Sequence, residues 1–290
     1  MTQTVDAHHH LWDPARAEYP WMTDDLAAIR RRFGPEDLGP LLAANGVDRT
    51  VVVQTRSSLD ETRELLATAA RHEFIAGVVG WVDLTAPDVP AQLEALHGGP
   101  GGVKLVGIRH QVHDEADPEW LGRSDVRRGL AAVGAAGLAY DLLVRTRELP
   151  AALAAVRDLP GMRFVVDHIA KPPIASGAID AWAAALEPLA ARPNVYCKLS
   201  GMVTEADWSR WTTADLAPYA TRVLDWFGPE RCVFGSDWPV CLLAASYPRV
   251  IDACRELTRD LAAADRDRIF GGTAVELYRL RVPVDAERRA

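Results

Sequence analysis

The sequence predicts a single (β/α)₈ barrel, the TIM-barrel class of α/β fold, and two observations support this prediction. Eight short runs rich in valine, isoleucine and other apolar residues alternate with longer stretches rich in alanine, leucine, arginine and glutamate. Eight rounds of strand and helix within one domain are typical of a closed barrel. The chain has 290 residues, a length at which many barrels form one unit.

The predicted strands have the composition of segments that are buried on both faces. Several contain unbroken apolar strings, such as Val51, Val52 and Val53, as parallel strands covered by helices do. An open, doubly wound sheet is the alternative, but no G-x-G-x-x-G motif follows the first strand. The predicted strands are residues 5–11, 50–55, 75–84, 102–110, 138–144, 163–168, 194–200 and 232–238.

Helices are predicted between these strands. Leu65, Leu66 and Ala69 recur at helical spacing, and Pro248 suits the start of the last helix. The glycine-rich residues 98–102 indicate a turn before the fourth strand, so we expect one domain over 1–284 and a tail at 285–290. The predicted helices are residues 60–72, 126–136, 147–158, 179–191, 215–227 and 249–263.

Composition argues against several classes of protein. The formal net charge of -8 argues against a nucleic-acid partner held through its phosphates. The chain has no run of eighteen apolar residues, and its first residues lack the features of a signal peptide. Its four cysteines form no C-x-x-C motif and are too sparse for a disulfide framework. We therefore expect a cytoplasmic protein, a monomer or homo-oligomer, that acts on a small molecule.

Polar side chains at the ends of three predicted strands form the main candidate site. In a barrel of this class the carboxyl ends of the strands meet at one rim, where active sites lie. The first strand ends with His8 and His10, which share a face because they are two residues apart. The sixth ends with His168 and the eighth with Asp237. A carboxylate after a buried strand needs a partner or a function, so we expect these four residues to converge.

The other strand ends supply a second group of candidates. Arg109 could clamp an oxygen and His110 could donate a hydrogen bond, whereas Lys104 and Lys198 could face either the pocket or the helices. A sugar ring can stack on tryptophan, although packing is the usual role of that side chain. The predicted substrate-binding residues are Trp12, Gln54, Trp81, Lys198 and Trp238.

Five sequence strings, taken together, resemble the amidohydrolase superfamily and its sugar-lactonase branch. They span nearly the whole chain in order, and their combination is more specific than any one of them. The strings are VDAHHHLWD (residues 5–13), GIRH (107–110), DHIAKPP (167–173), KLSGMVTE (198–205) and GSDWP (235–239).

The resemblance implies a distorted (β/α)₈ barrel that hydrolyses lactones of sugar acids, such as L-fuconolactone, L-rhamnonolactone or galactonolactone. By position it also implies that His8, His10, His168 and Asp237 hold one divalent metal, with zinc the first choice. The fifth strand offers Asp141 where the two-metal pattern has histidine, and Lys104 is not placed as an obvious bridging group. A two-metal site is therefore not expected, and related lactonases work with one metal or none.

The predicted reaction is the addition of water to a lactone carbonyl. Asp237 acts as general base on the water and passes the proton to the ring oxygen. A metal, or Arg109 with His110, polarises the carbonyl, and His168 serves both as ligand and as catalytic residue. Two alternatives stay open: a metal-dependent decarboxylase or other hydrolase on the same site, and a non-catalytic protein that binds sugar acids.

Overall fold

The predicted barrel is confirmed by a computed structural model, in which residues 3–281 are described. Eight parallel strands follow one another in the order β1 to β8. The barrel closes where β1 meets the chain after β8: the His10 amide donates to the Trp238 carbonyl at 2.7 Å, and the Asp237 amide to that of His8 at 2.8 Å. The strands are β1 (Val5–His9), β2 (Arg49–Val53), β3 (Ile75–Gly80), β4 (Leu105–His110), β5 (Ala139–Leu142), β6 (Phe164–Val166), β7 (Val195–Leu199) and β8 (Cys232–Phe234).

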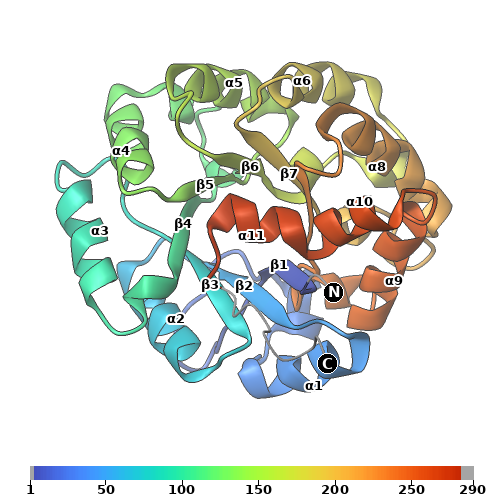
Figure 1. The fold of residues 1–290 in the computed structure, drawn as a ribbon, viewed down its shortest axis with the longest axis horizontal. Coiled ribbons are helices and arrows are strands. Elements are labelled where there is room, and N and C mark those ends of the chain that lie inside the picture. Colours follow the sequence, from blue (N-terminus) through green and yellow to red (C-terminus); the bar gives the residue numbers. More distant parts are fainter. Residues whose placement is uncertain (1–2, 282–290) are drawn as a thin grey trace, which may run out of the picture.

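The helices surround this barrel, as Figure 1 shows. Six lie close to predicted positions, while α1, α3, α7, α10 and α11 were not predicted. The last predicted helix, 249–263, was too long, because α9 ends at Leu257 and a turn follows. The helices are α1 (Pro35–Asn45), α2 (Leu59–Arg71), α3 (Val89–Gly98), α4 (Ser124–Ala135), α5 (Leu149–Asp158), α6 (Asp180–Ala190), α7 (Met202–Glu205), α8 (Thr213–Phe227), α9 (Tyr247–Leu257), α10 (Ala263–Asp267) and α11 (Thr273–Tyr278).

Several strands are shorter than predicted. The fourth begins at Leu105 because Gly102–Lys104 forms a 3₁₀ turn. The eighth ends at Phe234, and the residues after it leave the sheet to turn toward the barrel mouth. The predicted tail, 285–290, lies outside the described residues.

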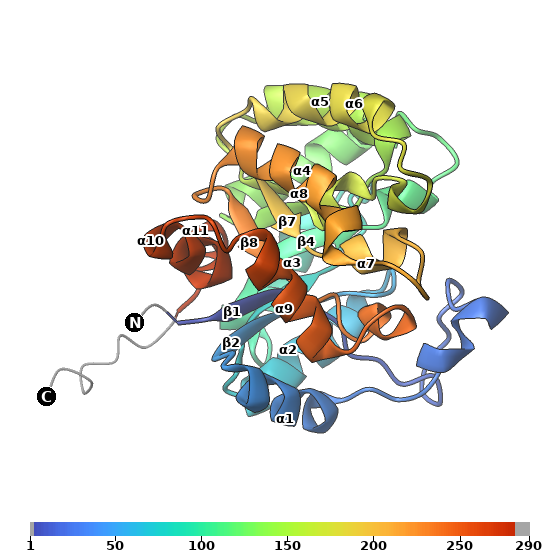
Figure 2. The ribbon, with the colours of Figure 1, turned by 90° about the vertical axis from the view of Figure 1, so that its right-hand side faces the viewer.

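The C-terminal helices cover the amino-terminal end of the barrel. In Figure 1, α10 and α11 cross in front of the strands, and Figure 2 shows them on the side opposite α7. Side chains from α11, among them Leu277 and Tyr278, pack with the apolar interior residues of the strands. This end is therefore filled, and the opposite rim is left for a site.

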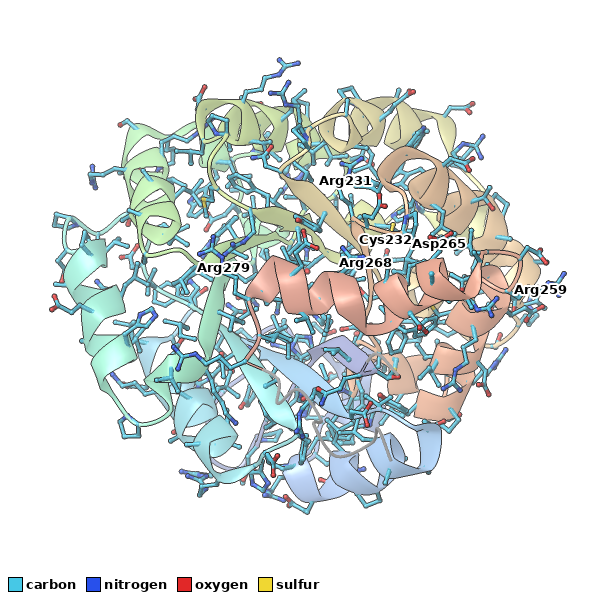
Figure 3. All side chains as sticks on the ribbon, in the orientation of Figure 1. Arg231, Cys232, Arg259, Asp265, Arg268 and Arg279 are labelled. Atoms are coloured by element: carbon cyan, nitrogen blue, oxygen red, sulfur yellow. The ribbon has the colours of Figure 1, made fainter. Side chains whose placement is uncertain are left out.

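Arginines on the amino-terminal face tie the helices to the strands. Figure 3 labels Arg231, Arg268 and Arg279 around α11. The guanidinium of Arg231 donates to the carbonyls of Ala190, Arg192, Val195 and Trp226. Within residues 3–281, no helix is long and apolar enough to span a membrane.

Candidate active site

A cavity of about 390 Å³ opens at the carboxyl ends of the strands. Four of the predicted site residues line it: His10, Arg109, His168 and Asp237. The loops that follow the strands supply the rest of the lining, which is Trp21, Leu26, Thr55, Gln111, His113, Asp114, Leu143, Arg145, Lys171, Thr204, Glu205, Trp208, Val240 and Leu243.

The three histidines and Asp237 converge at the floor of this cavity. His8 Nε2 lies 3.1 Å from His10 Nε2 and 3.8 Å from Asp237 Oδ1. The same carboxylate oxygen is 3.3 Å from His10 Nε2 and 3.9 Å from His168 Nε2. His9 points to the other face of β1, where its ring bonds Thr50 Oγ1 at 2.9 Å.

Unusual backbone conformations aim these side chains. Residues 168–171 form one left-handed turn with φ between 48° and 61°, closed by a bond from the Lys171 amide to the His168 carbonyl. Asp237 also has a left-handed φ of 56°. Such conformations cost about 1–2 kcal/mol per non-glycine residue and gather at functional sites. The turn brings His168 and Lys171 into the same cavity.

The four donor groups fit a single divalent cation. Zinc holds nitrogen and oxygen ligands at about 2.0–2.2 Å, so two ligands of one ion lie roughly 3–4 Å apart, as the distances above do. Ligand atoms of His8, His168 and Asp237 all lie within 4.8 Å of one another. His10 falls outside that set of three, although its Nε2 is close to His8 and Asp237.

Hydrogen bonds on the far side of each ring leave the Nε2 atoms facing the cavity. His10 Nδ1 lies 2.8 Å from the Val53 carbonyl, and His168 Nδ1 lies 2.9 Å from Ser200 Oγ. Such partners orient metal-binding imidazoles in proteins. The arrangement therefore suits nitrogen ligands held ready for one ion.

The electrostatics also suit a cation site. Burial, followed by the charge of Lys198, holds the pKa of His8 well below its usual value. Burial lowers the pKa of His168 to about 4. Burial would raise the pKa of Asp237, but the neighbouring His168 and His10 outweigh it and keep that pKa below its usual value. At neutral pH the imidazoles of His8 and His168 are therefore neutral, and the carboxylate of Asp237 is ionised.

A buried network of charges supports the floor from below. Lys198 Nζ lies 2.5 Å from Asp141 Oδ2, 2.9 Å from Asp167 Oδ1 and 3.1 Å from His8 Nδ1. Arg109 donates to Asp167 Oδ2 at 3.1 Å. Lys198 thus faces the barrel interior, whereas Lys104 bonds backbone carbonyls at the opposite end. Sequence reasoning missed Asp167, although it directly precedes His168 at a strand end.

Seven of the predicted site residues lie outside the cavity lining. His8 and Lys198 lie in or beneath its floor, and the other five flank it. His110 is held between Trp81, whose Nε1 donates to Nδ1 at 3.0 Å, and Glu115, at 2.7 Å from Nε2. Gln54 accepts hydrogen bonds from Arg109. The indoles of Trp12 and Trp238 pack edge-on against Phe33. These side chains support the walls of the site.

Sequence reasoning also missed the residues of the upper cavity wall. Lys171 Nζ lies 2.5 Å from Glu205 Oε1, and Arg145 lies 3.4 Å from Glu205 Oε2. Trp21 and Trp208 line the mouth. Glu205 ends helix α7, and the other four residues lie in loops. All five lie beyond the strand ends, so the alternation of side chains along a strand does not predict where they point. The available signal was their position, since Lys171 and Glu205 belong to the strings that carry the resemblance.

Comparisons with known proteins agree with this geometry. An L-fucono-1,5-lactonase from Burkholderia ambifaria is 46% identical over 98% of this chain and 98% of its own length. Another from Burkholderia multivorans is 41% identical over 97% and 98%. A crystal structure of a Burkholderia multivorans amidohydrolase with bound zinc superposes with a TM-score of 0.91 at 40% identity, covering 96% of this chain and 99% of that one. The family model for amidohydrolases matches residues 5–280, so the chain belongs to the amidohydrolase family.

Proposed function

We propose that the protein is a hydrolase that opens the lactone ring of a sugar acid, with L-fucono-1,5-lactone as the first candidate. The observation that carries this proposal is the ionised carboxylate of Asp237 beside three imidazoles at the floor of a cavity. The names of the two similar Burkholderia lactonases support the substrate class. A cavity of about 390 Å³ accommodates one sugar ring.

The same four residues hold one divalent metal in this proposal, and zinc is the first choice. The spacing of His8, His10, His168 and Asp237 and the zinc bound in the similar amidohydrolase support it. When bound, the cation would supply a Lewis acid that polarises the lactone carbonyl. Chelation should therefore lower activity, and readdition of zinc should restore it.

Asp237 moves the protons of the reaction. Its carboxylate takes a proton from water as the water oxygen bonds to the carbonyl carbon of the lactone. It then delivers that proton to the ring oxygen as the bond between carbonyl carbon and ring oxygen breaks. The left-handed backbone of Asp237 and the hydrogen bond from its amide to the His8 carbonyl fix the carboxylate where both transfers occur.

Arg109 and His110 take supporting roles in this mechanism. The guanidinium of Arg109 donates to Gln54, to Asp167 and toward His8, so its donors are used inside the barrel. His110 likewise has a partner on each ring nitrogen. The sequence offered Arg109 and His110 as the alternative to a metal for polarising the carbonyl. Because their donors are engaged in these contacts, we favour the metal.

A panel of aldonolactones with a pH indicator tests the proposed function. Hydrolysis releases a carboxylic acid, so the active lactones acidify a weakly buffered solution in proportion to turnover. We expect L-fucono-1,5-lactone to rank among the fastest. Purified, zinc-loaded protein that leaves every lactone at its spontaneous rate would refute the proposal and favour a binding protein or a decarboxylase.

We further infer that the protein acts in the cytoplasm on this small molecule. All four cysteines are buried as free thiols in the structure, as expected of a protein in a reducing compartment.

A further inference from the structure

The chain has three lysines, and the structure uses two of them as internal supports. Lys104 Nζ donates to the carbonyls of Ala69, at 2.6 Å, and Ile75, at 2.7 Å, at the amino-terminal end of the barrel. Lys198 is fully buried between two aspartates. Neither ammonium can reach a substrate in the cavity.

Lys171 differs from both. It lines the catalytic cavity together with Asp237 and His168, and its side chain is 14% exposed. Within residues 3–281, Glu205 Oε1 is the one acceptor paired with its Nζ. An ammonium has three N–H donors, so two of them stay uncommitted beside the reacting groups.

The backbone around Lys171 positions its ammonium in the cavity. Lys171 closes the left-handed turn that begins at His168. If the chain continued as an extended strand after β6, the Lys171 side chain would not have this position. Glu205, from α7, then fixes the end of the side chain with a charge-assisted contact.

Building on the proposed lactone hydrolysis, we propose that Lys171 is a catalytic residue that donates a hydrogen bond to the lactone carbonyl oxygen, and that Glu205 is its positioning residue. As the water oxygen bonds to the carbonyl carbon, the π electron pair moves onto the carbonyl oxygen. Lys171 stabilises this charge and keeps its own proton. The electron pair on the carbonyl oxygen then re-forms the C=O double bond as the bond between the carbonyl carbon and the ring oxygen breaks. The proton held by Asp237 goes to the ring oxygen.

Lys171→Met tests this role because it keeps the apolar stem and removes the donor and the charge. Removing one such donor typically lowers kcat about 10²- to 10³-fold, and we expect a loss in this range with KM nearly unchanged. Lys171→Arg should recover part of the loss. Glu205→Gln should lower kcat less than Lys171→Met. Lys104→Met, the same substitution at the far end of the barrel, is the matched control and should keep the wild-type kcat.

Product binding provides a readout that does not depend on turnover. The carboxylate of L-fuconate has an oxygen at the position of the former carbonyl, so the ammonium should bind it. Loss of one charge-assisted hydrogen bond should weaken binding about 10- to 100-fold in Lys171→Met, measured by calorimetry. Zinc content and circular dichroism should match the wild type.

The outcomes separate the two proposals. If the wild type hydrolyses no lactone, the proposed function fails. Suppose instead that the wild type hydrolyses lactones and Lys171→Met keeps the wild-type kcat, with or without a higher KM. Lys171 then does not stabilise the transition state, and the assignment is overturned. Unchanged L-fuconate affinity in a folded, zinc-loaded Lys171→Met variant would overturn it as well.

Discussion

Asp237 combines two properties that a general base needs. It is nearly fully buried, yet its pKa is lowered rather than raised, because His168 and His10 outweigh the effect of burial. The carboxylate therefore stays ionised at neutral pH and can accept a proton from water. Its position is fixed by the backbone, as the bond from its own amide to the His8 carbonyl shows.

Asp237→Asn should abolish this function while keeping the size of the side chain. An amide cannot accept the proton, and loss of a general base typically costs about 10²- to 10⁴-fold in rate. We expect kcat on the best lactone to fall by that factor, with the circular dichroism spectrum unchanged. Metal content must be measured alongside, since Asp237 is also a proposed ligand. Asp158→Asn, at a surface carboxylate paired with Arg127, is the matched control. Near-wild-type turnover by Asp237→Asn would contradict the mechanism.

Individual residues were predictable from the sequence where a strand fixes their direction. His8 and His10 share a face because side chains alternate along a strand, and the structure brings them to the same floor. Lys171 is the last of four consecutive non-glycine residues in a left-handed turn, a conformation that no residue preference indicates. Trp81 was expected to face a sugar, but its indole N–H is used by His110.

At the scale of elements, the loop after β7 shapes the left-handed turn after β6. Gly201 has a φ of 62°, and a Cβ at this position would lie 2.5 Å from His168 Nδ1. The His168 ring therefore rests directly against a glycine backbone. No larger residue fits there without moving a proposed metal ligand.

Gly201→Ala should displace His168 and lower activity. We expect kcat to fall by about 10²-fold, because a shift of roughly 1 Å in a catalytic group has a cost of that order. Gly177→Ala is the matched control, since Gly177 has a φ of 70° but nothing within 4 Å of a built Cβ. Gly177→Ala should lose about 1 kcal/mol of unfolding free energy by thermal denaturation, because alanine is strained at positive φ. Gly201→Ala should lose more, because the added Cβ also clashes with the His168 ring. Equal activity of the two variants would show that the ring contact at Gly201 has no catalytic consequence.

Helices and strands were predicted well where apolar residues recur at a regular spacing along the whole element, and poorly elsewhere. The apolar face of α2 was recognised in the sequence, and the structure buries Leu65, Leu66 and Ala69. The helix α1 has Pro40 in its interior, which weakens the helical signal. The eighth strand was predicted to reach Trp238, but Asp237 leaves the extended conformation. This left-handed conformation ends the strand early and places the Asp237 side chain in the cavity.

At the scale of the whole molecule, the two ends of the barrel are connected through its interior. Tyr278, on α11 at the amino-terminal end, donates its hydroxyl to Asp141 Oδ2 at 2.8 Å. The same oxygen pairs with Lys198, whose Nζ lies 3.1 Å from His8 Nδ1. The sequence could not predict this path, because α11 is short and its contact with β5 joins residues 137 positions apart.

Tyr278→Phe should destabilise the fold in a pH-dependent way. Burial raises the pKa of Asp141 to about 6, and the Tyr278 hydrogen bond is one of the contacts that oppose this rise. Without the hydroxyl the pKa of Asp141 should rise further. A carboxyl whose folded pKa exceeds its unfolded value loses stabilisation as pH increases from the unfolded pKa, about 3.9, through the folded one. Relative to the wild type, Tyr278→Phe should therefore lose little unfolding free energy at pH 5. At pH 8 the difference should reach about 1–3 kcal/mol, the cost of removing a hydrogen-bond donor from a buried ionised group.

Urea unfolding of wild type and variant at the two pH values would measure this difference. Tyr219→Phe is the matched control, because the Tyr219 hydroxyl donates to the carbonyl of Ala178, which does not titrate. Its destabilisation should be the same at pH 5 and pH 8. If Tyr278→Phe behaves like Tyr219→Phe, Asp141 is not the charged partner of α11. If only Tyr278→Phe becomes more destabilised at the higher pH, the C-terminal helix contributes directly to the buried charges beneath His8.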